Sequence, residues 1–156
     1  MAEPETNSFA TPRLTAGALF VDAAGRPLLV KPSYKPGWEI PGGYVNIGES
    51  PLAACHREIV EELGRSLPVA PQPLVVDWAP AANEGDKVLF IFDGGELSEA
   101  DLVAMAFADG EITEARFVDV SALDDHLPLR LANRMRLALE ARLQHRCVYA
   151  EHGRQP

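Results

Sequence analysis

Hydrophobic residues gather in short runs along the first third of the chain. Residues 14–21 and 27–31 are apolar enough to predict two strands, with turn-forming residues over 22–26 between them. We expect these two strands to pair as a hairpin. Residues 31–37 are too rich in Pro and Gly for a regular element, and they lead into an extended segment over residues 38–43.

A helix is predicted to follow Ser50. The serine side chain can cap exposed backbone N–H groups, and Pro51 loses no hydrogen bond at the first helical position. Gly64 is a natural stop. At about 100° per residue, two sets of side chains fall on opposite sides: Leu52, His56, Ile59 and Leu63 on one, and Glu58, Glu61 and Glu62 on the other. We expect the aliphatic side to be buried, with His56 packed or half-buried beside it, and the carboxylates to face outward or into a cleft.

The second half of the chain repeats both kinds of pattern. Residues 74–78, 87–92 and 112–119 read as strands, and residues 129–145 carry apolar side chains at helical spacing. One face of that helix is predicted from Leu131, Met135, Leu139 and Leu143. Strands mixed with two main helices predict an α+β fold, in which a mixed β-sheet lies between helices as an α/β/α sandwich.

Composition fits one domain. The chain has 156 residues, of which 47% are hydrophobic and 24% charged, which is ordinary for a globular protein with its own core. We assign residues 13–147 to a single domain, preceded by a polar leader (residues 1–12) and followed by a polar tail (residues 148–156).

Charge and cysteine usage narrow the possible partners. A net charge of −9 argues against a surface that follows nucleic-acid phosphates or anionic lipid, because both need clustered Lys and Arg. The sequence has neither a secretory signal nor eighteen consecutive apolar residues, so we expect no membrane segment. Cys55 and Cys147 lack metal-type spacing and read as free thiols of a reducing compartment, which predicts a cytoplasmic protein.

Three glutamates crowd into five positions of the first helix. Like charges three or four residues apart destabilise a helix by roughly 0.2–0.5 kcal/mol per pair, so Glu58, Glu61 and Glu62 are unfavourable together unless a cation joins them. A bound divalent ion would reverse the sign of that interaction. The cluster therefore predicts a metal site built on one helix.

The spacing of these residues resembles a family signature. Gly43, five residues, Glu49, seven residues, and then Arg57-Glu58-Ile59-x-Glu61-Glu62-x-Gly64 is similar to the box of the Nudix hydrolases. The family usually places a bulky aliphatic residue after the last glycine, where this chain has Arg65, so we expect Leu67 to turn inward in its place. The box covers 23 residues, and the strand order around it fits the family from about residue 14 to the last helix.

The resemblance implies Mg²⁺-dependent hydrolysis of a diphosphate linkage, with Mn²⁺ as a possible substitute. Mg²⁺ prefers oxygen ligands and commonly bridges carboxylates to substrate phosphates. Glu58 and Glu62, one turn apart, could share a metal, with Glu61 as a further ligand or a base. A bound metal would also explain how so acidic a protein accepts an anionic substrate.

Other residues of the box imply supporting roles. Arg57 resembles the family's arginine that pairs with the first box glutamate, Glu49, and we assign both to orientation of the site. Gly42 and Gly43 would let the backbone approach a metal or a phosphate closely. The general base is either a box glutamate or a residue outside the box, for which Glu111 and Glu114 are candidates.

The substrate implied is a small nucleoside diphosphate joined to another moiety, such as a nucleoside triphosphate, a nucleotide sugar or an ADP-ribose type. One alternative is removal of diphosphate from an RNA 5′ end, which the acidity disfavours. Another is a catalytically silent Nudix module that senses a nucleotide, although such modules typically lose box glutamates. A homodimer is possible, because dimers are common in the family.

Overall fold

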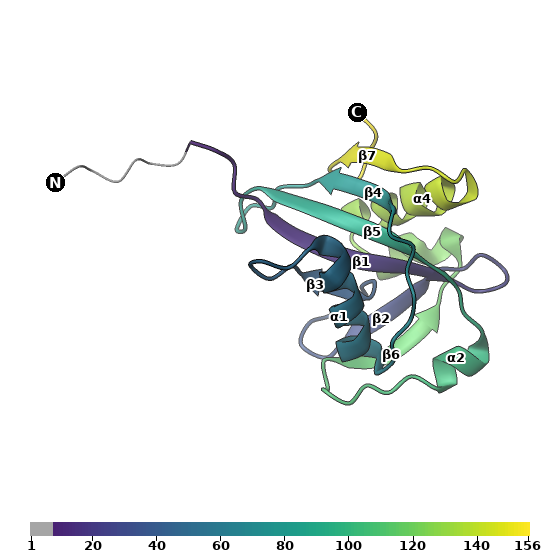
Figure 1. Cartoon of the computed structure of the whole chain (residues 1–156). Helices are drawn as coiled ribbons and strands as arrows, with labels where there is room; N and C mark the ends of the chain where they lie inside the picture. Colours follow the sequence, from purple (N-terminus) through teal and green to yellow (C-terminus); the bar gives the residue numbers. More distant parts are fainter. Residues whose placement is uncertain (1–7) are drawn as a thin grey trace.

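A five-stranded mixed sheet forms the middle layer of the molecule (Figure 1). The computed structural model describes residues 8–156, so the predicted leader over residues 1–12 lies mostly outside it. The strands of this sheet, in spatial order, are β3 (Gly42–Tyr44), β1 (Arg13–Val21), β5 (Lys87–Glu96), β4 (Pro73–Trp78) and β7 (Val148–Glu151). The β1–β5 and β4–β7 pairs are parallel and the other two are antiparallel.

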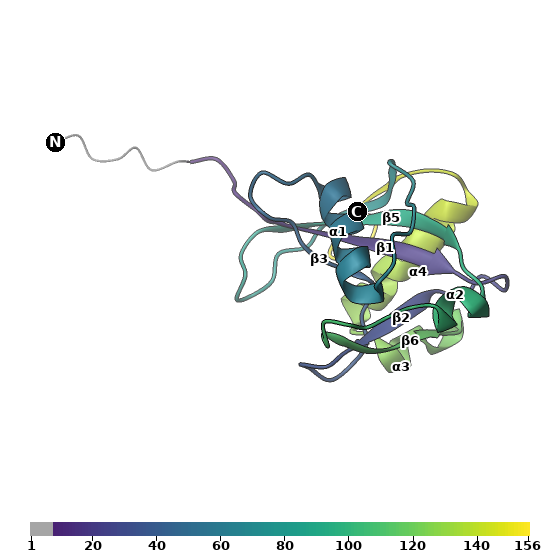
Figure 2. The same cartoon turned by 60° about the horizontal axis from the view of Figure 1, so that its bottom comes forward.

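A separate two-stranded antiparallel sheet pairs β2 (Leu28–Pro32) with β6 (Ile112–Phe117) (Figure 2). The predicted hairpin between the first two strands is therefore wrong, since they meet only at the bridge from Val21 to Pro27. The turn itself is well made, because Asp22 accepts hydrogen bonds from the backbone N–H groups of Ala24 and Arg26. The strands separate because both edges of β1 are already taken, by β3 and β5.

Helices cover both faces of the main sheet. Helix α1 (Pro51–Leu63) packs Ile59 and Leu63 against Phe20, while α4 (Leu129–Leu143) packs Met135 against Leu19 on the other face. The remaining helical segments are short: α2 (Glu99–Val103), the 3-10 turn Val120–Ala122 and α3 (Leu123–His126). The predicted α+β sandwich with a mixed sheet between helices is confirmed.

The two main helices differ in detail from the predicted faces. In α4 the fully buried positions are Ala132, Met135, Ala138 and Ala141, while Leu143 is 77% exposed. Small side chains let this helix approach the sheet closely, and the leucines flank the contact or leave it. His56 of α1 is exposed rather than packed, because the buried stripe runs through Cys55 and Ile59.

The end of the chain is part of the sheet. We predicted a polar tail over residues 148–156, but β7 adds the edge strand beside β4, and Val148 and Ala150 are buried. The alternation of these apolar residues with exposed Tyr149 and Glu151 is the signature of a half-buried strand. That prediction was wrong because four residues carry too short a pattern. Within residues 8–156, no helix is both long and apolar enough to cross a bilayer.

Candidate active site

Helix α1 begins and ends where the sequence predicts. The Ser50 hydroxyl accepts a hydrogen bond from the backbone N–H of Ala53 at 3.1 Å. Gly64 ends the helix in the left-handed region with φ 69°, where a Cβ would also lie 2.3 Å from the carbonyl oxygen of Ala106. Leu67 is buried while Arg65 reaches Asp101 at the surface, as expected from the departure in the motif. These fixed ends determine which way each box residue points.

Arg57 is the hub of the charged residues. Its guanidinium binds both carboxylate oxygens of Glu49, from Nε at 2.8 Å and from Nη2 at 2.9 Å. Its Nη1 donates to Glu58 at 2.9 Å and to Glu61 at 3.2 Å, and Nη2 also reaches the carbonyl oxygen of Tyr44 at 3.0 Å. The predicted pairing of Arg57 with Glu49 is therefore present, and it fastens the loop after β3 to the helix.

Two glutamates of α1 face the glycine pair on β3. A Cβ on Gly43 would lie 2.5 Å from Oε1 of Glu58, so the absent side chain leaves the space that this carboxylate occupies. Oε2 of Glu62 accepts a hydrogen bond from the backbone N–H of Gly42 at 3.1 Å. Gly42 has φ 150° and its Cβ position lies 2.4 Å from the carbonyl oxygen of Ala16, so only glycine fits there. The strand and the helix thus meet at two carboxylates.

The carboxylates of the site differ strongly in their affinity for protons. Hydrogen bonds from Arg57 lower the pKa of Glu49 to about 2. Burial raises the pKa of Glu58, and burial raises the pKa of Glu62 to about 9, with Glu58, Glu39 and Glu111 adding to the effect. Glu62 is 5% exposed. A buried carboxylate surrounded by other carboxylates favours either a proton or a metal ion.

The predicted metal ligands Glu58, Glu61 and Glu62 lie on the same helix, but their carboxylates do not converge on one point. Within residues 8–156, no three Asp, Glu, His or Cys side chains converge as a ready-made metal site. Glu58 and Glu61 turn to Arg57, whereas Glu62 turns to Gly42. The donor set still fits Mg²⁺, which keeps several waters and needs only one or two carboxylates from the protein. The assignment of Glu58, Glu61 and Glu62 as ligands stays a prediction.

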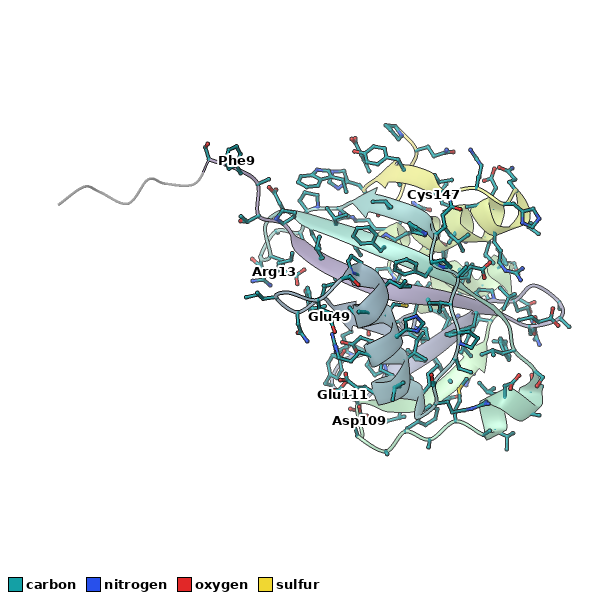
Figure 3. The ribbon with its side chains drawn as sticks, viewed as in Figure 1. Phe9, Arg13, Glu49, Asp109, Glu111 and Cys147 are labelled. Atoms are coloured by element: carbon teal, nitrogen blue, oxygen red, sulfur yellow. The ribbon has the colours of Figure 1, made fainter. Side chains whose placement is uncertain are left out.

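The two candidate bases outside the box are placed differently. Glu111 immediately precedes β6, lies along α1 beside Asp109 in Figure 3, and acts electrostatically on both Glu58 and Glu62. Glu114 instead pairs with Arg116 at 2.6 Å on β6. Glu39, which no sequence pattern singles out, also acts on Glu62 and lies four residues before Gly43 in the extended segment. The structure therefore keeps Glu111 near the site and adds Glu39.

A cleft of about 460 Å³ opens beside the glycine pair, a volume typical of small-molecule sites. Gly42, Gly43 and Tyr44 line it from β3, and Leu131 and Arg134 line it from α4. Tyr34 and Lys35, from the loop between β2 and β3, also line this cleft. Trp38 instead packs against His126, with ring centroids 5.9 Å apart. The cleft therefore extends from the glycine pair of β3 to the last helix.

The glutamates of α1 face a glycine pair beside this cleft. The sequence of the chain also matches a known family directly. Residues 11–141 match the family model described as NUDIX domain. The chain belongs to the Nudix family, and the predicted enzyme class, a Nudix pyrophosphohydrolase, is confirmed at that level. Nudix hydrolases generally use a divalent metal.

Relatives give a consistent picture of the fold. The solved MutT protein from Methanosarcina mazei Go1 superimposes with a TM-score of 0.67 at 22% identity, covering 88% of this chain and 99% of that chain. An ADP-ribose pyrophosphatase from Streptococcus suis superimposes with a TM-score of 0.61 at 24% identity, covering 90% and 99%. An RNA pyrophosphohydrolase of Blochmanniella floridana is 38% identical over 52 residues, a stretch that is 33% of this chain and 33% of that protein.

Proposed function

We propose that the protein hydrolyses a diphosphate linkage in a small nucleoside diphosphate joined to another moiety, with Mg²⁺ as its metal. The observation that carries this proposal is the meeting of α1 and β3, where Glu58 fills the space beside Gly43 and Glu62 bonds to Gly42. Bound there, Mg²⁺ would neutralise phosphate oxygens and lower the pKa of an attacking water. Mn²⁺ would substitute for it because it accepts the same oxygen ligands.

Each residue of the site has a role in this proposal. Glu58, Glu61 and Glu62 would hold the metal, and the hydrogen bonds of Arg57 fix the positions of Glu49 and Glu58. The backbone at Gly42 and Gly43 lets the diphosphate approach the carboxylates, because no side chain stands in the way.

The proton of the attacking water passes to a carboxylate. As the new P–O bond forms, the bond from phosphorus to the leaving phosphate oxygen breaks. We assign the base role to Glu111, whose carboxylate is exposed beside α1, with Glu61 as the alternative within the box. A general base must reach its proton directly or through one water, and both side chains are free of the burial that confines Glu62.

Product analysis in H₂¹⁸O tests the proposal. The protein is incubated with Mg²⁺ and a panel of nucleoside triphosphates, nucleotide sugars, ADP-ribose and dinucleoside polyphosphates. The masses of the products are then determined by mass spectrometry. We expect turnover that requires Mg²⁺. It should collapse in Glu62→Gln, whose carboxylate is buried, but not in the exposed control Glu96→Gln. The ¹⁸O-labelled product identifies the phosphorus that is attacked. Tight binding without turnover of any compound would favour a nucleotide sensor instead.

A second candidate function is hydrolysis at an RNA 5′ end. It is favoured by the 38% identity with an RNA pyrophosphohydrolase, which is confined to 52 residues. A 5′-triphosphorylated RNA belongs in the same panel. The protein carries a net charge of −9, which makes it a poor match for the negatively charged RNA backbone. We therefore expect small substrates to react faster than RNA.

Two further proposals concern the location and the assembly of the protein. We propose a cytoplasmic location because both cysteines are free, Cys55 buried and Cys147 exposed. A homodimer stays an expectation from the family resemblance, for which size-exclusion chromatography with light scattering is the direct measurement.

A further inference from the structure

A buried ion pair lies beside the cleft, where Arg134 of α4 forms part of the lining. Nε of Arg134 on α4 donates to Oδ2 of Asp77 at 2.5 Å, and Oδ1 of Asp77 accepts from the backbone N–H of Gly153 at 3.1 Å. Asp77 is fully buried and Arg134 is 6% exposed. Both oxygens of the aspartate are therefore engaged, and the arginine is fixed in one orientation.

The outer face of this guanidinium has no protein partner among residues 8–156. Only Nε of Arg134 takes part in a side-chain hydrogen bond there. In the same part of the chain, no fully buried side-chain nitrogen or oxygen lacks a partner, so the Nη groups must reach solvent. The solvent space that Arg134 lines is the cleft. Because Arg134 lines the cleft, its two Nη groups are the donors available to a ligand there.

The surroundings of these donors suit a neutral, flat ligand. Strand pairing puts Asp77 opposite Leu89, and Leu89 opposite Thr15, so Leu89 lies between the ion pair and Thr15 across the sheet. Leu89, Ile91 and Leu131 line this part of the cleft. Such walls match the faces of a nucleobase.

The charges that line the cleft are mostly compensated. Lys35 forms an ion pair with Glu39, and Lys87 forms one with Glu84 at 2.9 Å. Arg134 is balanced by Asp77 in the same way. A phosphate or carboxylate would therefore gain little net attraction here, whereas neutral hydrogen-bond acceptors match the donors without adding charge.

We infer that Arg134, held by Asp77, is a specificity-determining residue that selects a nucleobase with two adjacent acceptors, the O6 and N7 atoms of guanine or hypoxanthine. Arginine only donates hydrogen bonds, and guanine offers O6 and N7 as acceptors side by side. Adenine offers N7 beside an N6 amino donor, which would oppose an Nη donor. This inference rests on the proposed function, since it names the base of the nucleotide that the same site would hydrolyse.

Binding of substrate analogues that cannot be hydrolysed tests the inference apart from catalysis. Calorimetry in Mg²⁺ with the α,β-methylene diphosphates of guanosine, inosine, 7-deazaguanosine and adenosine measures the contribution of each acceptor. We expect guanosine and inosine analogues to bind equally, on the order of 10- to 100-fold more tightly than the adenosine analogue. The 7-deazaguanosine analogue, which lacks N7, should lie between them.

Two variants separate base recognition from folding. Arg134→Lys keeps the charge beside Asp77 but loses the paired donors, so the preference should fall to within about twofold. The double variant Asp77→Leu with Arg134→Met replaces the pair by apolar side chains, which buried ion pairs often tolerate, and it should lose the preference too. Thermal unfolding verifies that each variant is folded.

The outcomes are distinct from those of the hydrolase test. Equal binding of all four analogues, a preference for adenosine, no binding at all, or a guanine preference that survives Arg134→Lys would overturn the inference. A guanine preference that depends on Arg134, together with no turnover of any guanosine compound, would support the inference and overturn the hydrolase.

Discussion

Arg57 and Glu49 are joined by two hydrogen bonds that use both oxygens of the carboxylate, at 2.8 and 2.9 Å. The pair connects the middle of α1 with the loop that follows β3. Glu49 also accepts a hydrogen bond from the backbone N–H of Asn46 at 3.1 Å, which stiffens the loop from within. A planar, two-pronged contact fixes orientation as well as distance, so Arg57 presents Glu58 and Glu61 in defined positions.

Substitution of Arg57 should reduce activity because it disturbs the carboxylates that are proposed to bind the metal. Arg57→Lys keeps a positive charge but cannot bind Glu49 with two parallel donors, so we expect a 10- to 100-fold loss in activity or in Mg²⁺ affinity. Titration of the rate with Mg²⁺ distinguishes these two effects. The control is Arg65→Lys, which alters a surface contact with Asp101. Unchanged activity together with unchanged Mg²⁺ dependence in Arg57→Lys would show that the pair is an ordinary surface salt bridge.

Gly43→Ala should damage the site and spare the fold. The new Cβ would lie 2.5 Å from Oε1 of Glu58, and this flexible side chain can move away, so the stability should change little. Activity should fall 10- to 100-fold because a proposed metal ligand is displaced. Gly25→Ala is the matched control. Gly25 has φ 78° and open space around it, so its substitution should cost about 1–2 kcal/mol of stability with normal activity. The reverse pattern in the two variants would contradict the arrangement of Glu58 against β3.

Local signals explain what the sequence predicted well. The ends of α1 depend on Ser50 and Gly64, whose effects reach only three or four residues along the chain. The pairing of Arg57 with Glu49 was implied by the resemblance of the box to the family signature, and the structure contains it.

Contacts between distant segments explain what was missed. Asp77 and Arg134 are 57 positions apart, and neither lies in a recognisable motif. A lone aspartate inside an apolar strand is a weak hint of a buried partner, which the pattern cannot name. The wrong prediction of a hairpin has the same origin. Contacts across the whole sheet determine that β3 and β5, rather than β2, pair with β1.

The buried carboxylate of Glu62 should make the stability of the metal-free protein depend on pH. Its pKa is raised by burial from 4.5 to about 9, so the folded state holds the proton more tightly than the unfolded state. This contribution is fully present below about pH 4.5 and is lost as the pH rises toward 9. Between pH 5 and 9, the Tm of the wild type should fall by at least about 4 °C more than that of Glu62→Gln.

A series of thermal unfolding curves in chelator makes this comparison. Glu96→Gln, which changes an exposed carboxylate at the end of β5, should follow the wild type at every pH. Saturating Mg²⁺ should flatten the wild-type dependence, because the ion would replace the proton beside Glu62. Parallel curves for the wild type and Glu62→Gln would mean that the carboxylate is solvated in solution.

Removal of β7 should destabilise the whole domain. A chain that ends at Cys147 loses buried Val148 and Ala150, and it also loses the backbone N–H of Gly153 that binds Asp77. Burial of one valine is worth about 1.5–3 kcal/mol, and an unpaired aspartate oxygen in the core adds to the penalty. We therefore expect urea unfolding to report a loss of at least about 2 kcal/mol. A chain that ends at Arg154 removes only two exposed residues and should differ from the full chain by less than about 0.5 kcal/mol. Equal stability of both truncated chains would mean that the last strand merely lies against the sheet without supporting it.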